Sequence, residues 1–191
     1  MVTTIQVVTA ERFAQGLPWA QYVETIKSNK EQFIKNYQEF KLNPSDLEFF
    51  KGYVQRKGGV VNVLCLGEDW CPDVVRGLPI MVRIAEESGM TYKIFPRDTN
   101  LDIMEQYLNR RQHQSIPTFV FFNEEFKELG TWIERPAIAY KFMAELEGEL
   151  SKLNLSEEEL RAETRRRRLE AQELWKQETV REIRELLYRA I

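Results

Sequence analysis

Hydrophobic residues recur at helical spacing through the first part of the chain. From Trp19 to Phe40 they lie three, four or seven positions apart, which places them on one side of a helix. Asn43 and Pro44 then form a helix start, an N-cap side chain followed by proline at the first helical position. The pattern predicts one long amphipathic helix over 19–40 and a second helix from Pro44 to about residue 58.

Strands and helices alternate in the middle of the chain. Residues 60–66 are rich in valine and nearly all apolar, which is typical of a strand covered on both faces. Cys71 and Pro72 open a helix that Gly89 ends and that Pro79 is expected to kink. The later pattern predicts a strand at 91–95, a helix at 101–108, a hairpin of strands at 118–122 and 126–133, and a helix from Pro136.

This order of elements predicts an α/β protein with a mixed four-stranded central sheet and helices on both faces. We divide the chain into an N-terminal helical extension (1–58), a central α/β domain (59–150) and a charged C-terminal helix (151–191). A length of 191 residues favours one domain with extensions over two full domains.

The C-terminal segment from Ser156 differs from the rest of the chain in composition, because it is highly charged and has no glycine or proline. Ser156 to Glu159 is a capping box, and the absence of glycine and proline after it predicts a helix to about Tyr188. Four arginines at 165–168 suggest nucleic-acid binding, but residues 157–185 hold nine acidic and eight basic residues, which favours ion pairs along a solvated helix. The apolar side that includes Trp175 packs on the body or on a second subunit, so truncation after Asn154 is expected to keep the fold and change the mass in solution.

Composition and charge narrow the class of protein. With 43% hydrophobic and 30% charged residues the chain is typical of a soluble globular protein. The net charge of −3 gives no long-range field to attract nucleic acid or an anionic membrane, and neither partner is expected. No apolar stretch reaches the roughly 18 residues of a membrane helix, and the start of the chain lacks a signal-peptide pattern, so we expect a cytoplasmic protein.

Two cysteines and one histidine leave little room for a metal site or a disulfide framework. Phosphate-loop and zinc motifs are absent, and we predict no metal and no cofactor. Cys71 has the more reactive position, because a cysteine at a helix N-cap faces backbone N–H groups that favour the thiolate. The negative charges of Glu68, Asp69 and Asp73 act in the opposite direction and raise the pKa. We expect the helix N-terminus to have the larger effect, so that the pKa of Cys71 is lowered. The alternative is a half-buried structural cysteine.

The residues around Cys71 resemble the thioredoxin superfamily. The segment Trp70-Cys71-Pro72 follows an apolar strand and opens a helix, Pro79 lies eight residues after Cys71, and Ile116-Pro117 precedes another strand where that family has a cis-proline. The segment from Gly67 to Asp73 is most similar to a bacterial subgroup with an N-terminal helical extension. The resemblance covers roughly residues 43–147 and implies a thioredoxin fold.

The resemblance also implies chemistry. The first motif cysteine, here Cys71, attacks a substrate disulfide, and Trp70, Pro72, Ile116 and Pro117 border the bound segment. The family's second cysteine resolves the mixed disulfide, but this chain has Val74 at that position, which rules out the standard dithiol cycle. Cys65 is either a resolving thiol or a core residue, and its apolar surroundings favour the core.

Two functions follow from these residues. The first is thiol–disulfide exchange with Cys71 alone, on a protein thiol or disulfide or with a small thiol such as glutathione. The second is a non-catalytic module of the same fold that binds a protein segment. An iron–sulfur cluster held with glutathione is disfavoured by Pro72. Either function is compatible with a homo-oligomer that forms through the C-terminal helix.

Overall fold

The computed structural model describes residues 7–190. None of the helices in this range is both long and apolar enough to cross a membrane. The elements, in chain order, are α1 (Ala10–Ala14), α2 (Trp19–Thr25), α3 (Lys30–Glu39), α4 (Pro44–Gln55), β1 (Asn62–Gly67), α5 (Pro72–Ser88), β2 (Thr91–Pro96), a 3-10 turn (Arg97–Thr99), α6 (Leu101–Met104), β3 (Thr118–Phe122), β4 (Glu128–Ile133), α7 (Ala137–Leu150) and α8 (Glu157–Arg189).

The four strands form one mixed sheet in the order β2-β1-β3-β4. β1 is parallel to β2 and antiparallel to β3, and β3 is antiparallel to β4. Cys65 in β1 lies opposite Ile94 of β2 and Phe119 of β3, and all three side chains are fully buried. The sheet confirms the predicted α/β class, and its two central strands are apolar on both faces because helices or loops cover both.

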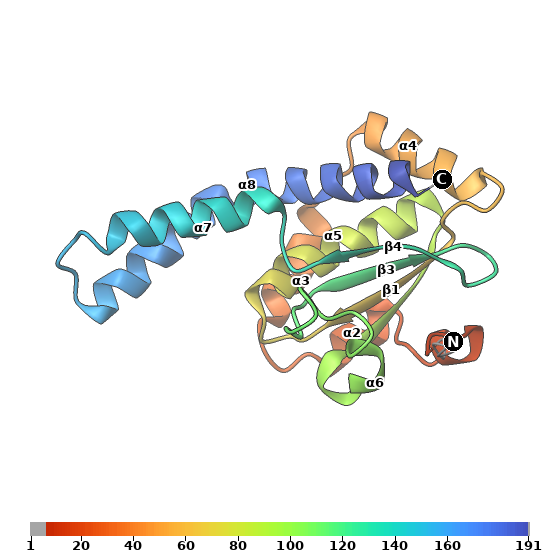
Figure 1. The fold of residues 1–191 in the computed structure, drawn as a ribbon, viewed down its shortest axis with the longest axis horizontal. Coiled ribbons are helices and arrows are strands. Elements are labelled where there is room, and N and C mark those ends of the chain that lie inside the picture. The colour runs from red at the N-terminus through yellow and green to blue at the C-terminus, as the bar shows by residue number, and fades with distance from the viewer. Residues whose placement is uncertain (1–6, 191) are drawn as a thin grey trace.

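The helices lie on both sides of the sheet (Figure 1). In that view α4, α5 and the last half of α8 lie above the sheet, and α1 and α6 lie below it. α5 is the central helix of the upper layer, because α3, α4 and α8 all pack on it. Its buried residues run from Asp73 to Ser88 with few interruptions, so α5 is enclosed by protein on nearly every side.

The single helix predicted over 19–40 is wrong. α2 ends at Thr25 and α3 begins at Lys30, and Asn29 between them has a left-handed φ of 61°. The break is stabilised from elsewhere in the chain, because the Asp69 carboxylate accepts the backbone N–H groups of Lys27 (2.6 Å) and Ser28 (3.0 Å). A tertiary hydrogen bond of this kind has no trace in local hydrophobic spacing.

Most other elements agree with the sequence pattern. Asn43 caps α4 through its side chain, and Gly89 ends α5 with a left-handed φ of 88°. The helix expected over 101–108 is shorter, because α6 ends at Met104 and the chain then turns through a bridge between Asn109 and His113. The five-residue α1, capped by Thr9, was not predicted, since it is too short for a periodic pattern.

The C-terminal helix α8 has two parts with different surroundings. Its first half and α7 project from the body as an antiparallel hairpin (Figure 1), joined by the Arg167–Glu149 ion pair at 2.9 Å. Its last half belongs to the main core through Val180, Ile183 and Leu187. These three side chains are buried, so we now expect truncation after Asn154 to destabilise the fold, contrary to the expectation from the sequence.

A single buried side chain tests this assignment of the tail to the core. We expect Ile183→Ala to lower the free energy of unfolding by about 2–5 kcal/mol, because it leaves a cavity beneath α8. The matched control is Leu153→Ala in the α7–α8 turn, where the side chain is 55% exposed and the change should stay within about 0.5 kcal/mol. Urea titration measures both, and equal midpoints for the two variants would contradict the assignment.

Candidate thiol site

Cys71 lies at the N-cap of α5, directly after the loop that leaves β1. Its backbone is extended (φ −85°, ψ 119°), and its carbonyl accepts the N–H of Val75 at 3.0 Å, the first bond of the helix. Pro72 occupies the first helical position, where a missing N–H costs nothing. Cys71 as a residue is partly exposed, so it lies at the edge of the surface where the helix starts.

The loop before β3 contacts this sulfur. The Ile116–Pro117 peptide bond is cis, and the Cys71 Sγ lies 3.6 Å from the Ile116 carbonyl oxygen, to which the thiol donates. Gly77 of α5 lies beneath the proline, where a Cβ would come within 3.1 Å of the Pro117 Cγ. A residue without a side chain at position 77 therefore allows α5 to approach the cis-proline loop this closely.

The expectation of a lowered pKa at Cys71 is wrong. Burial is the largest influence and raises the pKa of the Cys71 thiol, because a thiolate loses solvation there. The amides of Val74 and Asp73 oppose this by hydrogen bonding, and the charge of Arg135 opposes it as well. The carboxylate of Asp73 raises the pKa further. The sequence placed the helix N-terminus correctly but could not show how far the surrounding chain shields it from water.

The two other positions linked to the redox motif are both buried. Val74, at the position of the second motif cysteine, is fully buried, and its Cγ1 would lie 2.7 Å from a Cβ added at Gly67. Cys65 is fully buried within β1, and burial raises the pKa of its thiol strongly. Both cysteines are free thiols.

Two acidic residues before Cys71 fix its loop to other elements. The Glu68 side chain accepts the backbone N–H of Asp98 at 2.7 Å. The Asp69 carboxylate holds the break between α2 and α3, and the Asp69 carbonyl accepts the side-chain amide of Asn29 at 2.8 Å. The Asp69 contacts join the loop before Cys71 to the segment between α2 and α3, and the Glu68 contact joins it to the 3-10 turn after β2. From the sequence, both residues were expected to act only as negative charges near Cys71.

Trp70 is half exposed beside the thiol loop. Its ring lies 5.1 Å from the guanidinium carbon of Arg97, and Arg97 also donates to the carbonyl of Gln114 at 3.1 Å. Arg97 thereby connects the Trp70 loop to the loop that precedes Pro117. His113 is exposed in that second loop, as expected of a loop histidine. Asp98, to which the sequence assigned no role, pairs with Arg97 at 2.5 Å.

A buried charge cluster behind the first turn of α5 was missed. Asp73 pairs with Arg76 and with Arg135, each at 2.7 Å, and Arg168 of α8 lies 3.9 Å away. Asp73 and Arg76 are only 4% and 2% exposed. The available signal was an arginine inside the otherwise apolar face of a helix, since a buried charge requires a partner.

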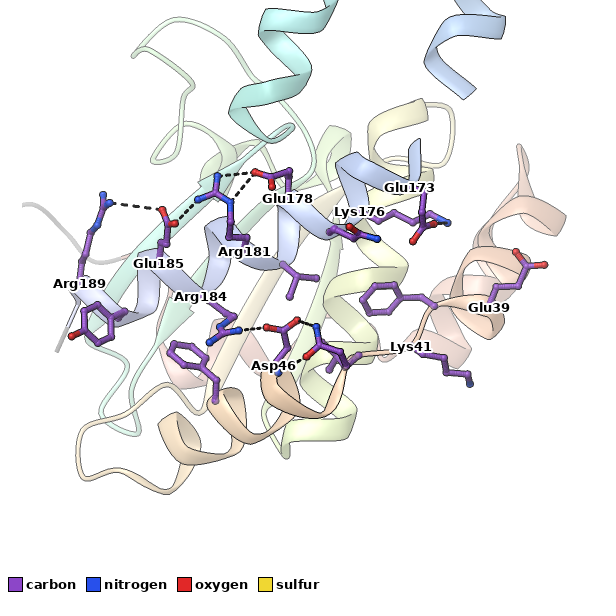
Figure 2. A pocket seen from close by; sticks show the side chains of 17 residues that line it. Glu39, Lys41, Asp46, Glu173, Lys176, Glu178, Arg181, Arg184, Glu185 and Arg189 are labelled. Atoms are coloured by element: carbon purple, nitrogen blue, oxygen red, sulfur yellow. Dashed lines mark hydrogen bonds and ion pairs between the residues drawn. The ribbon is translucent and has the colours of Figure 1, made fainter. Parts of the chain in front are cut away.

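A large cleft lies away from the thiol site, and the described residues form no metal site. Among residues 7–190, no three histidine, cysteine, aspartate or glutamate side chains are placed to hold a metal ion. The larger cleft, about 1170 Å³, lies between the last half of α8 and the segment from α3 to α4 (Figure 2). Most of its charges are paired with one another, as in Arg184–Asp46, Arg181–Glu178 and Arg189–Glu185. None of the described residues that line it comes from α5 or the cis-proline loop.

Comparisons with known proteins agree with this geometry. A family model described as thioredoxin matches residues 16–147. A protein of unknown function from Pseudomonas aeruginosa is 18% identical and superposes with a TM-score of 0.69, over 97% of this chain and 100% of that one. An HIV epitope-scaffold is 19% identical with a TM-score of 0.63, over 95% and 98% of the two chains. No curated protein matches. The predicted thioredoxin fold, with its long C-terminal helix, is thereby confirmed.

The raised pKa of Cys71 has a direct consequence for its reactivity. Because only the thiolate is nucleophilic, the rate of alkylation by iodoacetamide at neutral pH should fall below that of a small free thiol, and should still rise above about pH 8.5, the ordinary cysteine pKa. Mass spectrometry of quenched samples measures the rate at each cysteine. Cys65 should react only after unfolding, which makes it the internal control. A rate for Cys71 that levels off below pH 7 would contradict the structure.

Proposed function

Because this chain belongs to the thioredoxin family, we propose that it carries out thiol–disulfide exchange with a single nucleophilic cysteine, Cys71. The observation that carries the proposal is the position of Cys71, a partly exposed residue at the start of α5 whose sulfur lies 3.6 Å from the Ile116 carbonyl oxygen. A disulfide presented along the cis-proline loop would meet this sulfur first.

The proposed reaction is one exchange step. The Cys71 thiol first loses its proton to solvent, and the thiolate attacks one sulfur of a partner disulfide. A new S–S bond forms between Cys71 and that sulfur, and the other partner sulfur leaves as a thiolate. The raised pKa keeps the thiolate scarce at neutral pH, so we expect exchange to be slow until a bound partner favours it.

Release of the partner needs a second thiol. Val74 has no sulfur, so the resolving thiolate comes from a small thiol such as glutathione or from another protein. That thiolate attacks the mixed disulfide and frees either Cys71 or the partner. Cys65 is the remaining candidate, and because it is fully buried in β1, its attack requires local opening of the strand. An external thiol is therefore the favoured resolver.

We propose that four residues bind the partner segment. Trp70 is exposed and stacks with Arg97, so its ring offers an apolar surface beside the sulfur. Pro72 is exposed at the first turn of α5, and Ile116 and Pro117 form the loop beneath the thiol. An extended segment would pair with the backbone of this loop.

A non-catalytic binding module is the second candidate. It is favoured by one observation, that the resolving position is a valine packed on Gly67 while burial raises the pKa of Cys71. The two functions use the same surface around Cys71 and differ only in whether the sulfur forms a covalent bond. Substitution of the sulfur separates them.

Substituting Cys71→Ser should abolish the capture of partners as mixed disulfides, because the attacking atom is removed. The measurement is non-reducing electrophoresis and mass spectrometry after incubation with a disulfide-containing protein such as insulin. Cys65→Ala serves as the control and should retain capture. Persistent non-covalent binding by the Cys71→Ser variant, with no covalent adduct in the natural chain, would support the module instead.

Supplying the missing sulfur tests the scaffold. We expect Val74→Cys to raise the rate of insulin reduction with dithiothreitol by about tenfold or more, because an internal thiol resolves the mixed disulfide faster than a dilute external one. The matched control is Val74→Ala, which makes a similar loss of volume without a thiol. Equal rates in the two variants would contradict the placement of the redox site.

A further inference from the structure

A second cleft lies beside the thiol site, and we call it the basic cleft. Its volume is about 690 Å³, a size that suits a small-molecule ligand. It is walled by α3 with the residues before it, by the first turn of α5, and by the first half of α8. Pro72, the residue after Cys71, forms part of its rim.

The charge of the basic cleft is of one sign. Arg76, Arg161, Arg165 and Arg168 line it, and none of the described residues that line it carries a carboxylate. The larger cleft in Figure 2 is lined by equal numbers of acidic and basic residues, most of them paired. The basic cleft therefore differs from an ordinary solvated surface, on which opposite charges are mixed.

The four arginines at 165–168 divide between the two sides of α8. Arg166 pairs with Glu163 and Glu170, and Arg167 pairs with Glu149, as expected of ion pairs along a solvated helix. Arg165 and Arg168 point the other way and line the basic cleft. Among the described residues Arg165 has no ion-pair partner, and Arg168 has only the 3.9 Å contact with Asp73.

Unpartnered donors lie at the inner wall of the cleft. Arg76 is 2% exposed, and only its Nη1 is paired, with Asp73, which leaves its Nε and Nη2 without a hydrogen-bond partner in the described chain. Trp175 is 1% exposed, and its Nε1 also lacks a partner there. Both residues line the cleft. The Arg76 guanidinium also stacks on the Trp175 ring, with its central carbon 5.2 Å from the ring centroid. Buried donors normally have acceptors, so these three N–H groups are available to an acceptor from outside the chain.

The nearby carboxylates do not cancel this charge. Asp73 is shared by Arg76, Arg135 and Arg168, and Glu134 pairs with Arg135 alone. At the outer end, Glu157 pairs with Arg161. Arg165, Arg168 and Arg76 thus retain a net positive charge toward the cleft.

We propose that the basic cleft binds a small organic anion through a carboxylate or phosphate group. The guanidinium groups of Arg76, Arg165 and Arg168 match the paired oxygens of either group. Leu160 and Leu169, 40% and 58% exposed, add an apolar wall for the rest of the ligand. The anion would sit one residue from the thiol loop, beside Pro72. The site is independent of the exchange chemistry proposed for Cys71.

The test measures binding of two simple probes, inorganic phosphate and citrate, at constant ionic strength maintained with sodium chloride. The readout is the indole N–H resonance of Trp175 in a nitrogen-15 spectrum, assigned by Trp175→Phe. We expect a saturable shift with at least one probe, and comparison of the two shows which oxyanion is preferred. A shift that sodium chloride alone reproduces would mean charge screening and would overturn the proposal.

Charge-removing variants locate the site. Arg165→Gln and Arg168→Gln should each weaken the affinity for the bound probe about tenfold, the effect of losing one charge-assisted hydrogen bond. Arg181→Gln, on the same helix but paired with Glu178 and Glu185 outside the cleft, is the matched control and should bind as the natural chain does. Both cleft variants keep the buried Asp73–Arg76 pair, so they are expected to fold. Unchanged affinity in both would overturn the proposal.

A further titration distinguishes a small ligand from a macromolecule. A short single-stranded oligonucleotide is titrated against the same resonance, with and without the better probe. If the oligonucleotide alone shifts Trp175 and neither probe competes with it, the cleft serves nucleic acid and the small-anion assignment is wrong. If phosphate or citrate binds at least as tightly as the oligonucleotide does, the small-anion assignment is supported.

Discussion

The enclosure of α5 is the constraint on which the rest of the structure depends. The sheet covers one side of this helix, while α3, α4 and α8 cover most of the others, so residues from Asp73 to Ser88 are largely buried. Polar side chains on such a helix must find partners inside the protein. Asp73 and Arg76 meet this demand together with Arg135, and Asn36 donates to the Val75 carbonyl at 2.8 Å.

The same enclosure governs the chemistry at the start of α5. A helix N-terminus stabilises a thiolate, whereas removal of water destabilises it, and at Cys71 the loss of solvation is the larger effect. Asp73 adds to it because the carboxylate that neutralises Arg76 also lies near the sulfur. Burial thus links the charge cluster, the raised pKa of Cys71 and the cleft lined by the remaining arginines.

Prediction from sequence succeeded where a feature is local. The strand that holds Cys65, the cap at Asn43, the end of α5 at Gly89 and the position of Cys71 all follow from neighbouring residues. Prediction from sequence failed where a residue far away in the chain forms the deciding contact. The helix over 19–40 is interrupted because Asp69 accepts two of its backbone amides, a contact across about forty positions.

Local sequence was enough to predict the order of the strands, most of the helices, the family resemblance and the absence of sulfur at position 74, because periodicity, caps and motifs depend on residues close together in the chain. The pKa direction of Cys71, the partners of Asp73 and the division of the four arginines between ion pairs and a cleft could be seen only in the folded chain. Solvation and charge pairing depend on which segments meet in space, and α3, α5 and α8 are separated by many residues in the chain.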